Sequence, residues 1–93
     1  MEAKFAAALA AAREQAEALG IRIRPAEPSE ALKNARRTLS GRRLSDGFNQ
    51  LQAKGRLDLS LEALVIDKRF TALFTDEEAN EALGRLLEAG YRF

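Results

Sequence analysis

Apolar residues recur at helical spacing along most of the chain, and this pattern predicts a series of short amphipathic helices. In the first 20 residues, Phe5, Leu9, Ala12, Ala16 and Leu19 fall on one stripe. Alanine, the strongest helix former, fills the positions between them. Because Gly20 suits the left-handed position after a helix, we expect a first helix over residues 2–19.

Two further helices are predicted in the middle of the chain. Ser29 is a plausible cap for the first, which we expect to run through residue 39. Ser45 or Asp46 can open the second, which we expect to end at Gly55.

The last third of the chain carries the clearest local signal. We expect a helix to start near Ser60 and a helical turn over residues 70–74. Thr75 and Glu78 then form a capping-box pattern at the start of a helix that Gly90 closes. Its predicted apolar stripe comprises Ala79, Ala82, Leu83, Leu86 and Leu87.

These elements predict an all-α fold, a compact bundle of four to five short helices in one domain over residues 1–93. Residues 21–24 alternate apolar and basic side chains, so a minimal β ribbon between 21–24 and 91–93 is the alternative addition. The expected core comprises Leu9, Leu32, Leu39, Phe48, Leu51, Leu64, Phe70, Phe74, Leu83 and Leu87.

Charge is segregated along the chain, although the net charge is only +1. Residues 31–57 hold seven basic residues and one acid, a net charge of +6, whereas residues 58–93 hold four basic residues and eight acids, a net charge of −4. Two electrostatically different surfaces are typical of a protein that binds a partner.

The basic block supplies the candidate partner-binding residues. They are Lys33, Arg36, Arg37, Arg42, Arg43, Lys54 and Arg56. Three interpretations are open: a solvated surface that bridges to the acidic half of the chain, a docking surface for an acidic protein, or a surface for phosphates of a nucleic acid. A nucleic-acid-associated complex would combine the last two partners.

A helix-turn-helix built from residues 31–39 and 45–54 fits poorly. The motif needs a small residue four positions before the glycine of the turn so that its helices can cross closely. The chain has Arg37 before Gly41 and Leu51 before Gly55. The low net charge and the lack of aromatic residues among the arginines also favour a protein partner over nucleic acid.

The residues for common catalytic chemistry are missing. The sequence has no Cys and no His, which removes the usual nucleophilic thiol, the usual general base and the commonest transition-metal ligands. The acids at 76, 77 and 78 match the positive end of a helix dipole. We therefore expect a small regulatory adaptor or inhibitor, with no enzymatic activity, no metal and no cofactor.

The remaining expectations concern location and source. There is no apolar run near 18 residues, so the sequence predicts no membrane span and a cytoplasmic protein. Its Ala, Arg, Leu and Glu content is typical of a GC-rich bacterial genome. The sequence leaves the oligomeric state open.

Overall fold

The computed structural model describes residues 2–25, 27–41 and 43–91. The helices are α1 (Glu2–Ala18), α2 (Ala31–Ser40), α3 (Phe48–Ala53), α4 (Leu61–Val65) and α5 (Asp76–Glu88). Three 3₁₀ turns lie between them: η1 (Pro28–Glu30), η2 (Leu57–Leu59) and η3 (Thr71–Leu73). The described residues form no strand, and the predicted all-α bundle is confirmed.

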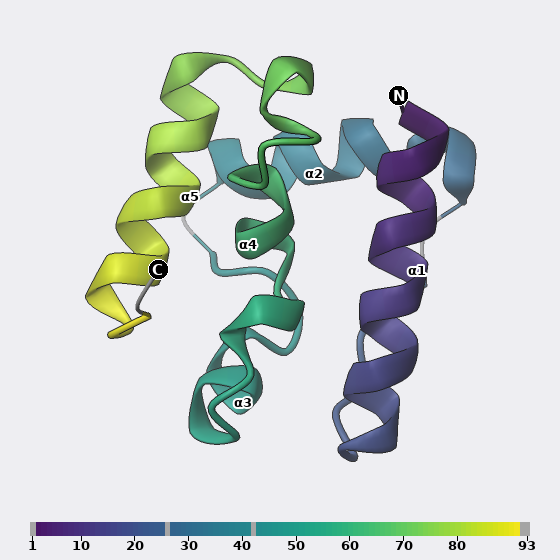
Figure 1. Ribbon diagram of the computed structural model, residues 1–93, viewed down its shortest axis with the longest axis vertical. Coiled ribbons are helices and arrows are strands. Elements are labelled where there is room, and N and C mark those ends of the chain that lie inside the picture. The colour runs from purple at the N-terminus through teal and green to yellow at the C-terminus, as the bar shows by residue number, and fades with distance from the viewer. Residues whose placement is uncertain (1, 26, 42, 92–93) are drawn as a thin grey trace.

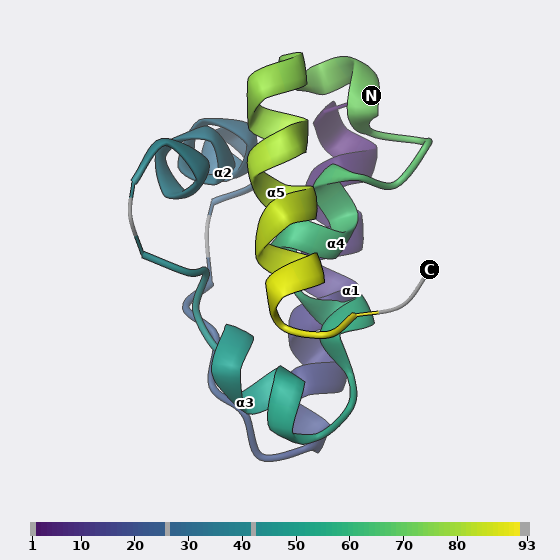
Figure 2. The ribbon, with the colours of Figure 1, turned by 90° about the vertical axis from the view of Figure 1, so that its left-hand side faces the viewer.

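The short helix α4 lies between the two longest helices, α1 and α5 (Figure 1). Helix α2 crosses behind them and contacts both α1 and α5. Helix α3 lies near the opposite end of the long axis from α2, as both views show (Figures 1 and 2). The arrangement is compact, with a radius of gyration of 11.9 Å.

Helix α1 packs on the core through one aromatic residue and several alanines. The ring of Phe5 meets the rings of Phe70 and Phe74 edge to face, each with a centroid distance of 5.4 Å. Such pairs contribute about 0.5–1.5 kcal/mol beyond the area that they bury. Ala12 and Ala16 are also buried, and their small side chains let α1 approach its neighbours closely. The predicted stripe of α1 is therefore its packing face.

Most of the expected core is confirmed. Six of the expected residues are buried: Leu39, Phe48, Leu51, Leu64, Phe70 and Phe74. Leu9 and Leu32 are half-buried and pack against the same cluster. Leu83 and Leu87 are the exceptions, because Leu83 is only half-buried and Leu87 is 56% exposed.

The predicted ribbon does not form in the described part of the chain. Ile21 is buried and Ile23 is half-buried, while Arg22 and Arg24 are exposed, so the alternation is real. The segment packs against the turn before α3, however, with no strand as its partner among the described residues. Residues 92–93 of the predicted ribbon lie outside the described residues.

The helix ends follow the sequence, but two helix starts do not. α1, α3 and α5 end at glycines with positive φ, as predicted. Ser29 does not cap α2, because it lies inside η1, and the N-cap residue is Glu30 without a side-chain hydrogen bond. Proline at position 28 starts a 3₁₀ turn first, and the α-helix follows directly from it.

Neither Ser45 nor Asp46 caps α3, which begins after Gly47 without a side-chain cap. A Cβ atom at Gly47 would lie 2.9 Å from Cγ2 of Ile21 and 3.2 Å from Cγ1 of Ile23, and φ there is +75°. Only glycine fits both the backbone conformation and the close approach of the isoleucines. The Ser45 side chain is engaged elsewhere, on Glu62.

A buried ion pair joins α4 to α5. Glu62 is fully buried, Arg85 is 7% exposed, and Nη1 of Arg85 lies 3.2 Å from Oε2 of Glu62. The hydroxyl and the backbone N–H of Ser45 donate to the same carboxylate. Nε of Arg85 donates to Glu81 at 2.6 Å. Every hydrogen bond of the Glu62 carboxylate therefore ties α4 to another part of the chain.

The same guanidinium also caps α2. Nη2 of Arg85 donates to the carbonyl oxygens of Thr38 at 3.1 Å and Gly41 at 2.9 Å, and more weakly to that of Leu39 at 3.5 Å. These carbonyls belong to the end of α2, where helical carbonyls lack partners. A positive charge is also favourable at this end of the helix dipole. Arg85 therefore replaces a local C-cap with a contact from a distant helix.

We expect Thr75→Ala to lower the free energy of unfolding by about 1 kcal/mol, because the capping box is present. Oγ1 of Thr75 accepts from the Glu78 backbone N–H at 3.1 Å, and Oε1 of Glu78 accepts from the Thr75 backbone N–H at 2.8 Å. Urea unfolding followed by circular dichroism measures the change. Thr71→Ala, in the exposed turn η3, is the control, and equal midpoints for Thr75→Ala and wild type would contradict the prediction.

We expect Arg85→Met to lower the free energy of unfolding by about 3–5 kcal/mol, because it leaves a buried carboxylate without its cation. The double variant Glu62→Leu with Arg85→Met should lose less than the sum of the single losses. A double-mutant cycle from urea unfolding measures this coupling. Additive losses in the cycle would show that the two side chains do not depend on each other.

Candidate functional site

The structure divides the predicted basic residues between two ends of the molecule. Lys33, Arg36 and Arg37 lie on α2, whereas Lys54 and Arg56 follow α3 near the opposite end (Figures 1 and 2). Arg43 lies in the connection between these helices, and Arg42 lies outside the described residues. The six predicted positions that the structure describes therefore do not gather into one patch around α2.

Two of the predicted cations are already paired within the chain. Nη2 of Arg36 donates to the carbonyl oxygen of Leu73 at 2.7 Å, and its Nε lies 3.7 Å from Oε1 of Glu78. Arg56 pairs with Asp58 through two hydrogen bonds of 3.1 and 3.2 Å. These bonds, together with the carboxylate charge, raise the pKa of the Arg56 guanidinium above its ordinary value. Both side chains are thus already bonded to other groups of the chain.

The other predicted cations are exposed and have no carboxylate partner within the described part of the chain. They are Lys33, Arg37, Arg43 and Lys54. Lys33 and Arg37 are four residues apart on α2, so they share one face of the helix. Helix α2 therefore supplies two cations that no ion pair within the described residues neutralises.

A groove runs beside this helix. Its apolar lining comes from α1, α2, α4 and the segment before η1, and comprises Leu9, Ile23, Pro25, Ala31, Ala35 and Leu61. Its polar lining comprises Arg24, Asn34, Arg37, Thr38 and Asp46. Ile23, Arg24 and Pro25 also line two neighbouring depressions, so the groove adjoins a wider hollowed surface.

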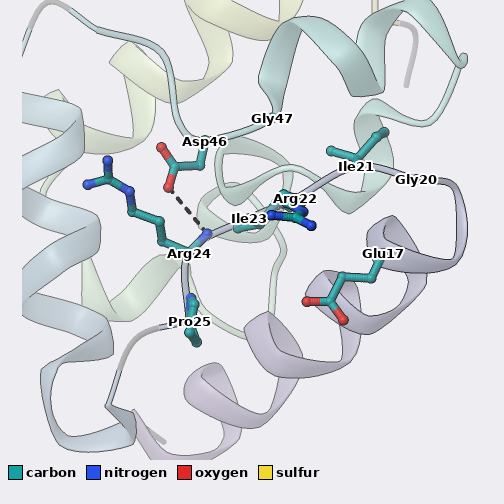
Figure 3. A pocket seen from close by; sticks show the side chains of 9 residues that line it. All are labelled: Glu17, Gly20, Ile21, Arg22, Ile23, Arg24, Pro25, Asp46 and Gly47. Atoms are coloured by element: carbon teal, nitrogen blue, oxygen red, sulfur yellow. Dashed lines mark hydrogen bonds between the residues drawn. The ribbon is translucent and has the colours of Figure 1, made fainter.

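Arg24 reaches this groove from the extended segment that follows α1. Figure 3 shows its side chain pointing toward α2, with the carboxylate of Asp46 beside it. The backbone N–H of Arg24 donates to Oδ2 of Asp46 at 3.4 Å. The packing of Ile21 and Ile23 on Gly47 fixes the segment, and therefore the position of Arg24.

Sequence reasoning missed Arg24 as a site residue. In the sequence it reads as the polar side of a short alternating segment, 13 positions before Arg37. Only the packing of the segment on Gly47 brings residue 24 beside α2. The mixed lining of the groove can bind an extended peptide, since guanidinium groups bind carboxylates and aliphatic walls accept small apolar side chains.

The described residues form neither a metal-binding cluster nor a membrane-spanning helix. No group of three or more Asp or Glu side chains there is arranged to hold a metal ion. None of the described helices is long and apolar enough to cross a membrane.

Comparisons with protein-family models, curated proteins and solved structures gave no match to this chain. The function is therefore inferred from the arrangement of the chain's own residues.

The two adjacent arginines of α2 should differ in their effect on stability. Arg36→Gln should lower the free energy of unfolding by about 0.5–1 kcal/mol, because it removes a charged hydrogen bond to Leu73 at a half-exposed site. Arg37→Gln should leave the free energy of unfolding unchanged. Urea unfolding measures the free energy of unfolding of both variants. A larger decrease in Arg37→Gln than in Arg36→Gln would contradict the prediction, because it would show that Arg37 is the arginine that stabilises the fold.

Proposed function

We propose that this chain is a small non-enzymatic binding protein, an adaptor or inhibitor, that holds an acidic segment of a partner protein in the groove beside α2. The observation that carries the proposal is the division of the basic residues into two classes. Arg36 and Arg56 are paired within the fold, whereas Arg24 and Arg37 are exposed and line the groove together with its apolar residues.

Three polar residues of the groove and one neighbouring lysine have a role in this proposal. Arg37 and Arg24 can each offer parallel N–H donors to a carboxylate of the partner. Lys33, one turn from Arg37 on α2, adds positive charge that attracts an acidic segment over a longer range. The side-chain amide of Asn34 can pair with the backbone of an extended peptide.

The chemistry of the groove favours a protein over a nucleic acid. Its lining includes six apolar residues, which can accept the small apolar side chains of a peptide but give a phosphate backbone nothing to bind. None of the residues that line it is aromatic, so it offers no stacking surface for a base. Nucleic-acid affinity depends on many phosphate contacts, and this face offers three unpaired cations among the described residues: Arg24, Lys33 and Arg37.

The proposal narrows the site that the sequence suggested. Arg43 and Lys54 are exposed cations outside the groove lining, and they contribute only to the general positive charge. We place the interaction in the cytoplasm, because a chain without cysteine needs no oxidising compartment for its stability.

A display library of random peptides tests the proposal. Peptides of about 12 residues are long enough, when extended, to cross the 28 Å longest dimension of the molecule. Selection on the wild-type chain should enrich peptides that combine Asp or Glu with small apolar residues. The double variant Arg24→Gln with Arg37→Gln should bind the selected peptides about tenfold more weakly by fluorescence anisotropy, since each exposed ion pair contributes up to about 1 kcal/mol.

The matched control is Arg43→Gln with Lys54→Gln, which removes the same charge from positions outside the groove. Its affinity for the selected peptides should stay close to that of wild type at 0.15 M salt, where long-range charge effects are screened. Equal losses of affinity in both double variants would contradict the proposed site, because they would show that the peptides respond only to the overall positive charge. Tight binding of a random DNA duplex with a steep salt dependence would instead favour the nucleic-acid function.

A further inference from the structure

Helix α5 presents leucines to solvent on the side away from its packing face. Leu87 is 56% exposed, and Leu83, one turn earlier, is half-buried and lies outside the core cluster that the structure describes. The buried face of the helix is formed by Ala82, Arg85 and Leu86. An apolar pair at this spacing is the usual form of a helix-docking surface.

A glycine lies beside these leucines on the helix surface. Nothing lies within 4 Å of the position that a Cβ atom of Gly84 would occupy. A glycine inside a helix costs about 1 kcal/mol relative to alanine, and no neighbour in the described part of the chain requires one here. Its absent side chain lets the backbone of another helix approach closely.

Acidic side chains lie beside Gly84 on the helix surface, on the side opposite to the two leucines. Glu77, Glu81 and Glu88 fall on one face of α5, because they are separated by four and seven residues. The only basic residue of the helix, Arg85, points inward to Glu62. Glu81 pairs with Arg85 but remains about half exposed, and Glu77 and Glu88 are exposed.

The charge pattern decides which partner fits. If two copies of α5 packed antiparallel on Leu83 and Leu87, the acidic edge of one copy would run along the acidic edge of the other. A parallel pair would offer these acids no cation from α5, because its one basic residue, Arg85, is buried. Like charges at an interface are unfavourable. A basic amphipathic helix avoids this repulsion, because its apolar side covers Leu83 and Leu87 while its Lys or Arg residues meet the acids.

We propose that the outer surface of α5, formed by Leu83, Gly84 and Leu87 and flanked by Glu77 and Glu88, docks a basic amphipathic helix of another protein. This site is separate from the groove beside α2 and does not depend on the function proposed for that groove. With both surfaces, the chain can bridge an acidic segment on one face and a basic helix on another.

The test uses two designed helical peptides with the same leucine stripe, one with Lys and one with Glu at the remaining positions. Each is titrated into the isotope-labelled chain and followed by NMR. We expect the Lys peptide to shift signals of residues 77–88 and to bind at least about tenfold more tightly than the Glu peptide. Leu87→Gln should lower the affinity for the Lys peptide about tenfold, since it removes a leucine contact that is buried in the complex.

Leu44→Gln is the matched control, because Leu44 is the other large apolar side chain that is clearly exposed in the described residues. It should leave the affinity unchanged. Gly84→Ala separates docking from folding. It should raise the midpoint of thermal unfolding, because alanine favours the helix and the site has room for its methyl group. It should nevertheless lower the affinity for the Lys peptide.

Three results would overturn the proposal. The first is equal affinity for the Lys and Glu peptides. The second is an unchanged affinity in Leu87→Gln or Gly84→Ala. The third is self-association of the wild-type chain that Leu87→Gln abolishes, because it would assign the surface to a second copy. Arg24→Gln with Arg37→Gln should leave the Lys peptide bound, so this test can fail independently of the groove.

Discussion

The contact between Arg85 and Glu62 is the constraint on which the rest of the structure depends. One guanidinium pairs with the carboxylate of α4 and donates hydrogen bonds to the last carbonyl oxygens of α2, so three helices meet at a single buried charge. Ser45 completes the carboxylate's hydrogen bonds and thereby holds the connection between α2 and α3 against α4. A buried ion pair is tolerated only with such complete hydrogen bonding.

This constraint also shapes both proposed surfaces. The connection that Ser45 anchors carries Asp46 and Gly47, which position the extended segment and with it Arg24. On α5, Arg85 lies on the buried face with Ala82 and Leu86, whereas Leu87 lies on the exposed side of the helix. One polar contact inside the molecule therefore leaves a cationic groove beside α2 and an exposed leucine surface on α5.

The charge segregation of the sequence becomes spatial in the fold. The cations of α2 and the acids of α5 lie on helices that pack against each other, and the contact between Arg36 and Glu78 marks their boundary. Arg13 with Glu17, Arg56 with Asp58 and Arg69 with Asp67 are pairs within short stretches of chain, so they neutralise charge locally. The charges left unpaired give the two surfaces opposite sign.

The sequence by itself determined the all-α class, the helix ends at glycine, the capping box of α5 and most of the core, because these features depend on neighbours within a few residues. Tertiary structure alone decided that Arg85 is buried and Leu87 is exposed. The apolar spacing of the helix predicts the opposite, because it places leucine in the core and contains no information about Glu62, the carboxylate 23 positions away that pairs with Arg85. It also decided the site: Arg24 joins Arg37, and Lys54 and Arg56 separate from them, because packing on Gly47 sets the path of the chain between the helices.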